Sequence, residues 1–365
     1  MSRFTNEIGA NPGRAGHRLA IEASRVIYDV REKVCALFNG PDPMRVIFSS
    51  NITNALNLAL HGLLHPGDHV ITSSMEHNAV MRPLRALEKC GVQVTVAACD
   101  QDGQLDPLKI EAAIRPNTRL VVINHGSNVT GTLLPIREIG EITRRHGLLF
   151  LVDSAQTGGV WPIDMEADQI DLLAFTGHKS LLGPMGTGGL IIGGQVDLAQ
   201  LPALVQGGTG SRSEEEYQPD FAPDKYESGT QNAVGLAGLA AGIDWIQHKS
   251  LDAILAHDQR LTASLISGLL SVPGVTVYGT HDAQLQTATV SFNIKHWSPS
   301  EVGLVLDERF NILCRVGLHC APAAHKTMQT FPEGTVRFGL GVFNTLAEVE
   351  QGIRAVQTLA SERQQ

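Results

Sequence analysis

Short apolar runs alternate with helical patterns along the first half of the chain. Between residues 17 and 38, apolar side chains recur every three or four positions, which predicts a helix with one buried stripe. Seven short apolar runs follow and predict strands at residues 46–48, 70–72, 92–96, 120–123, 148–152, 171–175 and 190–192. Near-continuous apolar strands are typical of a sheet that is buried on both faces. We therefore expect an α/β fold with a mostly parallel, seven-stranded sheet between layers of helices.

The pattern changes in the second half. Residues 206–231 predict a long irregular segment, and residues 232–270 predict a long helical region. The remainder predicts a small α+β unit, with strands near 275–277, 288–292, 312–315 and 336–338, a helix over 299–310 and a closing helix after Thr345. We expect a large domain over residues 1–246 and a small C-terminal domain over residues 247–365.

The composition narrows the class of protein. The chain has 365 residues, of which 43% are hydrophobic and 18% charged, and its net charge is −9 without a long basic stretch. Nucleic acid and an anionic membrane are therefore disfavoured as partners, and a small soluble substrate is expected. The sequence shows no apolar run long enough to cross a bilayer and no signal-peptide core, so we expect a cytoplasmic protein.

The five cysteines form no CxxC pair, and the 14 histidines show no metal-binding spacing. We therefore expect no metal site and at least one free thiol. Four cysteines lie in helix-like or strand-like runs and are predicted to be small buried side chains: Cys35, Cys90, Cys99 and Cys314. Cys320 instead lies in a loop after Arg315, where a basic setting favours a reactive thiolate.

Polar residues follow five of the predicted strands, at residues 49–53, 75–78, 124–128, 153–156 and 176–179. Because the carboxyl ends of parallel strands meet at one edge of a sheet, these loops are predicted to line one pocket. Lys179 is the most informative residue among them. A lysine after a strand usually only reaches solvent, but glycines on either side of Lys179 would allow a ligand to approach for covalent chemistry.

Pyridoxal phosphate would give each loop a role, because it needs a lysine for its imine, a carboxylate for its ring nitrogen, an aromatic plane and phosphate donors. Read one at a time, the candidates keep ordinary alternatives. Asp153 alone is more typical of a turn or helix cap, Thr53 is equally typical of an N-cap, and His77 of a polar loop. Asn128 and Gln156 are amides that could bond the cofactor's phenolic oxygen or a substrate carboxylate, but single amides more often occur as turn or cap groups.

The separated motifs together resemble the class V aminotransferase-fold family of pyridoxal phosphate-dependent cysteine desulfurases and selenocysteine lyases, nearest to its group II members. The resemblance covers nearly the whole chain and rests on segments 75–78, 127–131, 152–156, 176–179, 227–232, 315–321 and 336–338. It implies a fold-type I enzyme. It also implies that Lys179 forms the imine, that His77 stacks on the ring and that Asp153 binds the ring nitrogen.

The same resemblance implies the remaining contacts. Gln156 would contact the phenolic oxygen, and Asn128 and Arg337 would bind the substrate carboxylate, with Arg315 as a further substrate contact. The phosphate would be held by Ile52, Thr53, Thr176 and His178, together with Gly229 and Thr230. Thr230 matches a residue that family members supply to the neighbouring subunit, so a homodimer with composite sites is implied.

Cys320 lies in the segment Arg315-Val316-Gly317-Leu318-His319-Cys320-Ala321, which resembles the short active-site loop of group II desulfurases. The resemblance implies that L-cysteine becomes L-alanine while its sulfur forms a persulfide on Cys320, which a reductant or a sulfur-acceptor protein discharges. Two departures stand out. Leu318 replaces a second histidine, and the strand-forming segment that usually opens the family is not matched before Gly9.

Three alternatives remain at this point. A selenocysteine lyase or another C–S lyase would use Lys179 and Arg337 but would not depend on the thiol. A nucleotide-binding dehydrogenase is less consistent, because no GxGxxG motif opens a βαβ unit. A dimeric sulfur-relay scaffold with impaired catalysis is the third.

Overall fold

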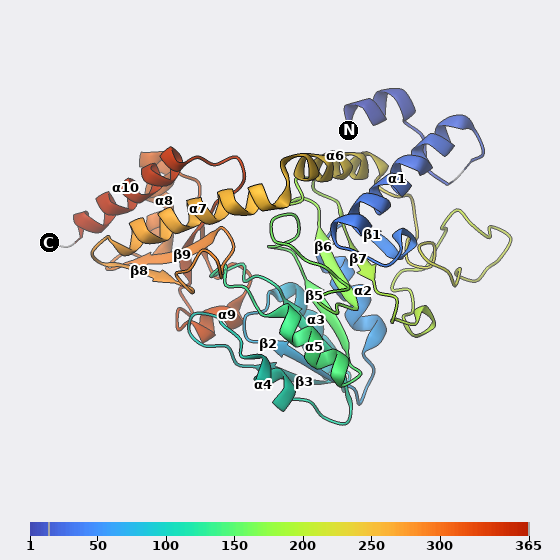
Figure 1. Ribbon diagram of the computed structural model, residues 1–365, viewed down its shortest axis with the longest axis horizontal. Coiled ribbons are helices and arrows are strands. Elements are labelled where there is room, and N and C mark those ends of the chain that lie inside the picture. Colours follow the sequence, from blue (N-terminus) through green and yellow to red (C-terminus); the bar gives the residue numbers. More distant parts are fainter. Residues whose placement is uncertain (14, 364–365) are drawn as a thin grey trace.

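A seven-stranded sheet forms the centre of the larger part of the molecule (Figure 1). The computed structural model describes residues 1–13 and 15–363. The strand order is β1-β7-β6-β5-β4-β2-β3. The strands are β1 (Val46–Ser49), β2 (His69–Ser73), β3 (Gln93–Ala97), β4 (Thr118–Asn124), β5 (Leu149–Asp153), β6 (Leu172–Thr176) and β7 (Gly188–Ile192). All seven predicted strands are confirmed within a residue or two of their predicted positions.

The strand directions place the predicted loops together. Strands β3, β2, β4, β5 and β6 pair in parallel, whereas β7 is antiparallel to both β6 and β1. Two successive reversals give β1 the same direction as the parallel strands, so β7 is the one reversed strand among these seven. The carboxyl ends of β1, β2, β4, β5 and β6 therefore share one edge, as expected for a mostly parallel sheet.

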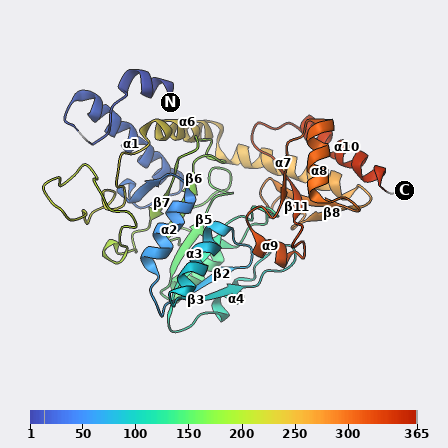
Figure 2. The same cartoon turned by 180° about the vertical axis from the view of Figure 1, so that it is seen from behind.

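Helices cover both faces of this sheet (Figures 1 and 2). Alternate strand residues enter two separate cores: Val121 packs with one group of helices, and its neighbour Leu120 with the other. The first core contains residues of α1 (Arg18–Leu37), α4 (Pro107–Ala112), α5 (Ile136–Arg145) and α6 (Ala233–Lys249). The second contains residues of α2 (Ile52–Leu63) and α3 (Asn78–Lys89). Burial on two sides explains why the strands are apolar at consecutive positions.

A second, antiparallel sheet has the order β10-β11-β9-β8 and belongs to the C-terminal part of the chain (Figure 2). Its strands are β8 (Val275–Tyr278), β9 (Thr289–Ile294), β10 (Arg315–Gly317) and β11 (Thr335–Gly339). They share a core with α7 (Leu251–Leu270), α8 (Pro299–Phe310) and α10 (Leu346–Glu362). Helix α9 (Pro322–Thr327) packs elsewhere: its Ala324 lies in a small cluster with Met75, which follows β2.

The second half differs from its prediction in two places. Residues 232–270 form two helices, α6 and α7, because Ser250 between them adopts a left-handed backbone with a φ of 69°. The strand predicted at 312–315 instead begins at Arg315, and the apolar Leu313 before it is 81% exposed. The domain boundary at residues 246–247 lies close to the break at Ser250 and stays a prediction.

The remaining segments are short or irregular. A π-helical turn covers Phe4–Ile8, and 3-10 turns cover Pro43–Arg45 and Leu198–Gln200. The segment 206–231 contains no helix or strand, as predicted. In the described ranges, no helix combines the length and apolar character that crossing a membrane requires.

Candidate active site

Lys179 lies in the turn that follows β6, at the shared edge of the sheet. Gly177 fits this turn because a Cβ there would collide with the side chain of Thr187. The side chain of Lys179 is accessible to solvent, yet it lies among other charged groups. Desolvation lowers its pKa, the nearby Asp153 carboxylate opposes this effect, and Arg337 and Arg315 lower the pKa further. The balance of these effects makes Lys179 easier to deprotonate than an ordinary lysine.

Asp153 ends β5 and is 3% exposed. Its Oδ1 accepts a hydrogen bond from the backbone N–H of Ala155 at 2.9 Å. Burial raises the pKa of Asp153, whereas this hydrogen bond and the charge of Lys179 lower it. A buried carboxylate of this kind suits a cationic partner such as a protonated ring nitrogen.

His77 caps α3, and its Nδ1 accepts a hydrogen bond from the N–H of Ala79 at 3.0 Å. Desolvation lowers the pKa of His77 to about 4, and the positive charges of Lys179 and Arg315 act in the same direction. The imidazole is therefore neutral near pH 7. Its flat, uncharged ring is available for stacking.

Arg337 lies on β11 and reaches the large sheet, where its Nη1 donates to the backbone oxygen of Asn128 at 2.6 Å. The side chain of Asn128 donates through Nδ2 to the backbone oxygen of His319 at 2.6 Å. The Oδ1 of Asn128 is buried and has no hydrogen-bond partner among the described residues. Desolvation lowers the pKa of Arg337, and the neighbouring Arg315 adds to this effect. Two adjacent guanidinium groups make the region strongly attractive to a carboxylate.

Cys320 is exposed and lies against the same arginine pair. The Nη2 of Arg315 donates to its Sγ at 3.4 Å. The backbone oxygen of Cys320 accepts from the N–H of Asn78, the residue after His77, at 2.8 Å. Cys320, His77 and Thr53 also line one open groove of about 410 Å³. The structure thus brings the thiol of the second unit to the loops of the large sheet.

The expected phosphate donors lie around the start of α2 and the lysine turn. Ile52 and Thr53 form the first turn of α2, and the cap residue is Asn51 rather than Thr53, because Oδ1 of Asn51 accepts from the N–H of Asn54. In the lysine turn, Thr176 Oγ1 and His178 Nδ1 are 3.0 Å apart. Hydroxyl groups near a helix N-terminus are suited to an anion.

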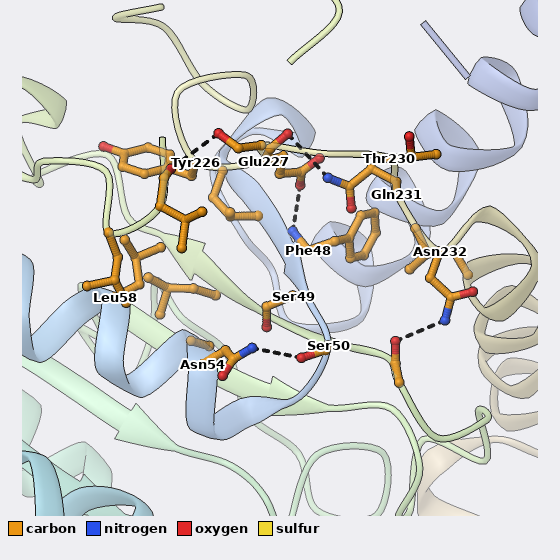
Figure 3. Close-up of a pocket in the computed structure, with 18 residues that line it drawn as sticks. Phe48, Ser49, Ser50, Asn54, Leu58, Tyr226, Glu227, Thr230, Gln231 and Asn232 are labelled. Atoms are coloured by element: carbon orange, nitrogen blue, oxygen red, sulfur yellow. Dashed lines mark hydrogen bonds between the residues drawn. The ribbon is translucent and has the colours of Figure 1, made fainter. Parts of the chain in front are cut away.

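Gly229 and Thr230 lie near the end of the irregular segment 206–231, and neither is among the residues that line the groove at Cys320. Thr230 lines a different cavity of about 380 Å³, together with Ser50 and Asn54 (Figure 3). Gln156 lies near Gly126, since a Cβ added at Gly126 would be 3.5 Å from the Cβ of Gln156. Among the described residues, the structure defines no hydrogen bond between Gln156 and the other candidates. The roles of these three residues stay predictions.

The wall of that second cavity is fixed by a buried ion pair. Glu227 accepts from the backbone N–H of Phe48 at 2.6 Å (Figure 3). The same carboxylate pairs with both terminal nitrogens of Arg31 from α1, and one of these nitrogens also donates to the backbone oxygen of Val46. The side chains of Arg31 and Glu227 are 6% and 5% exposed. This network connects α1, β1 and the long irregular segment.

Two residues of the site were given no role by the sequence patterns. Glu76 is fully buried, accepts from Ser73 Oγ at 2.6 Å and from the backbone N–H of Asn124, and has its pKa raised to about 8 by desolvation. His319 is 2% exposed. Both lie inside motifs that the sequence singled out, but polar letters in a loop-like run do not reveal burial. Burial was also mispredicted for Cys90, which is exposed at the end of α3, where the chain leaves the core.

These residues fit the expected cofactor. The chemistry of the donor set matches pyridoxal phosphate: a lysine with a lowered pKa, a buried carboxylate, a neutral imidazole and hydroxyl groups at a helix start. The orphaned Oδ1 of Asn128 adds a buried acceptor that a bound ligand could satisfy.

Comparisons with known proteins agree with this geometry. The family model described as Aminotransferase class-V matches residues 1–351. A probable cysteine desulfurase of Methanothermobacter thermautotrophicus is 36% identical over 353 residues, which cover 96% of this chain and 88% of that protein. A cysteine desulfurase of Serratia proteamaculans is 31% identical over 360 residues, with coverages of 95% and 85%. The apo structure of a cysteine desulfurase from Thermococcus onnurineus NA1 superposes with a TM-score of 0.93 at 30% identity, over 99% of this chain and 90% of that one.

Proposed function

Since this chain belongs to the class V aminotransferase family, we propose that it is a pyridoxal 5′-phosphate-dependent cysteine desulfurase. The reaction converts L-cysteine to L-alanine and leaves the sulfur as a persulfide on Cys320. The names of the relatives support this activity. The observation that carries it is the position of Arg315, whose guanidinium contacts the Cys320 sulfur and acts electrostatically on Lys179. The nucleophilic thiol and the amine thus share one site.

The cofactor would be held by the residues that the fit identifies. Lys179 would attach it covalently, Asp153 would pair with the ring nitrogen, and His77 would lie against the ring. The phosphate would be bound by the donors at the two turns: Ile52, Thr53, Thr176 and His178. When bound, pyridoxal phosphate supplies an electron sink for the bonding electrons at Cα of the substrate.

The chain's own groups would perform the remaining work. Arg337 and Asn128 would bind the substrate carboxylate and so orient Cα toward Lys179. The amine of Lys179 would remove the Cα proton, because desolvation and the two arginines favour its neutral form. The Cys320 thiolate would attack the substrate sulfur, and the C–S bond would break as the new S–S bond forms. The substrate carbon skeleton then takes up protons and leaves as alanine.

We also infer a homodimer that works in the cytoplasm. Within one chain, Thr230 lines a cavity with Ser50 and Asn54, whereas Thr53 lines the groove at Cys320. A second copy could bring its Thr230 to the phosphate donors. The exposed apolar side chains of Leu204, Val205 and Tyr217, on and beside the same irregular segment, support an interface there.

The test replaces Cys320 by alanine. Cys320→Ala should abolish sulfide and alanine formation from L-cysteine while the visible absorbance of the bound cofactor stays at the parent level. Cys90→Ala is the matched control, because Cys90 is also an exposed free thiol but lies at the far end of α3. Sulfide production at the parent rate in Cys320→Ala would exclude Cys320 as the sulfur acceptor.

A further inference from the structure

The turn that carries Cys320 has an unusual backbone. His319 and Cys320 both adopt left-handed conformations, with φ of 48° and 60°. Neither residue is glycine, and two such residues in succession persist only where surrounding contacts determine the backbone. The question is which contacts hold this turn.

Hydrogen bonds from distant segments fix its main chain. The backbone oxygen of His319 accepts from Asn128 Nδ2 at 2.6 Å, and that of Cys320 accepts from the N–H of Asn78 at 2.8 Å. The side chain of His319 points away from solvent, and its Nε2 lies 3.1 Å from Oγ1 of Thr335 on β11. The imidazole therefore makes a third contact that holds the turn, in addition to those from Asn128 and Asn78.

The hydroxyl groups behind His319 define which of its nitrogens carries the proton. Ser291 Oγ donates to the backbone oxygen of Val129 at 2.6 Å, so its only proton is used. The contact of 3.2 Å between Thr335 Oγ1 and Ser291 Oγ then requires Thr335 to donate. Thr335 can only accept from His319, which must carry its proton on Nε2.

This tautomer leaves His319 without a proton to give elsewhere. Its Nδ1 holds a lone pair and is buried without a hydrogen-bond partner in the described part of the chain. Desolvation lowers the pKa of His319 to about 3, and the positive charge of Arg337 contributes to the shift. The ring is neutral at the pH values where enzymes usually work, which favours an anchoring role over acid catalysis.

Strand β11 connects this anchor to the substrate site. Thr335 and Arg337 are two positions apart, so their side chains project from the same face of the strand. Arg315 on β10 pairs in register with Arg337, and Gly317 pairs with Thr335. One short strand pair therefore sets the anchor, the arginine that contacts Cys320 and the arginine expected at the substrate carboxylate.

We propose that His319 is a positioning residue for Cys320: its Nε2–H bond to Thr335 holds the left-handed turn that keeps the Cys320 sulfur against Arg315. The proposal rests on the proposed function for the role of Cys320, and it adds a residue that acts through the shape of the loop. Without the anchor, the turn relaxes and the sulfur leaves the guanidinium.

Two amide substitutions separate anchoring from mere space filling. The amide nitrogen of glutamine reaches the place of Nε2, whereas that of asparagine reaches only the place of Nδ1. The measurement is the rate at which iodoacetamide alkylates Cys320 in the cofactor-loaded protein, read by peptide mass spectrometry relative to the exposed Cys90. His319→Gln should keep the parent ratio, and His319→Asn should lower it roughly tenfold, the factor that corresponds to one lost hydrogen bond.

The partner residue gives an independent arm. Thr335→Val should lower the alkylation ratio as His319→Asn does, Thr335→Ser should keep it, and the combined His319→Asn and Thr335→Val variant should lose no more than either alone. Equal ratios for His319→Gln and His319→Asn, or an unchanged ratio in Thr335→Val, would overturn the proposal. If His319→Asn fails to fold, as seen by circular dichroism, the two threonine variants decide. Alkylation does not require turnover, so it tests the anchor even if no alanine is formed from cysteine.

Discussion

The buried pair between Arg31 and Glu227 allows a quantitative test of what holds the long irregular segment to the sheet. Replacing Arg31 by methionine keeps an apolar stem of similar length but removes the guanidinium. The Glu227 carboxylate would then lose both of its bonds to Arg31 and keep the N–H of Phe48, and the oxygen of Val46 would lose its bond to Arg31. Both side chains are about 95% buried, so water cannot replace these bonds.

Removing one partner of such a buried pair costs about 3–5 kcal/mol of the free energy of unfolding. Adding Glu227→Gln should recover part of the loss, because no charge is then left buried, and the double variant should lie within about 2 kcal/mol of the parent. The free energy of unfolding of Arg31→Met should also depend on pH. Desolvation already raises the pKa of Glu227 and Arg31 opposes the shift, so removal of Arg31 raises this pKa further. A raised folded-state pKa gives stability below the unfolded pKa, near 4.5, that is lost as the pH rises.

The assay is urea unfolding of the parent, the two single variants and the double variant at pH 5 and pH 8, followed by circular dichroism. Arg18→Met is the control, because Arg18 lies on the same helix and pairs with Glu22 at 3.8 Å, but its side chain is 84% exposed. It should change the free energy of unfolding by less than about 0.5 kcal/mol. The reasoning fails if Arg31→Met is no more destabilising than this control, or if its deficit is the same at both pH values.

Two further outcomes follow from single groups. His125 is buried, and desolvation lowers its pKa from 6.5 to about 4. Its contribution to the free energy of unfolding is therefore complete above pH 6.5 and falls as the pH drops, by about 3 kcal/mol at pH 4. The free energies of unfolding of the parent and of His125→Gln should converge between pH 7 and pH 4, and a constant difference would contradict this. Thr345 caps α10 in a box with Glu348, with backbone-to-side-chain bonds of 2.7 and 3.3 Å, so Thr345→Ala should cost about 1 kcal/mol. Thermal melting should show a lower midpoint for Thr345→Ala but not for Thr358→Ala, whose hydroxyl only bonds back within the exposed face of the same helix.

The large sheet could be predicted because most of its strands contain consecutive apolar residues, as strands buried on both faces do. Its one reversed strand could not. Residues 188–192 end in an apolar run like those of the parallel strands, and such a run does not indicate the direction of its strand. The break between α6 and α7 was missed because Ser250 is neither glycine nor proline, although it adopts a positive φ and caps α7 with its side chain.

For the site, the sequence identified the reactive groups but not their support. Lys179, Asp153, His77, Arg337 and Cys320 follow strands or lie in short motifs, and the structure brings them into mutual electrostatic contact. The partners of buried His319 are the hydroxyl groups of Thr335 on β11 and, behind it, Ser291 on β9. Both lie in largely apolar strands, where a sequence pattern does not reveal a polar contact. Thr230 differs from these residues, because its predicted role requires a second copy of the chain.

The turn at Cys320 determines when, during folding, this thiol reaches its reactive position. Its fastenings come from Asn78, Asn128 and Thr335, and the bond between Asn128 and His319 spans 191 positions of sequence. Contacts between such distant segments form only after long loops have closed. An incompletely folded chain therefore carries Cys320 as one ordinary thiol among five. We expect the Cys320 sulfur to reach its position against Arg315 only after both sheets have formed and packed together. The alkylation rate of Cys320 during refolding should therefore report when this last step of folding is complete.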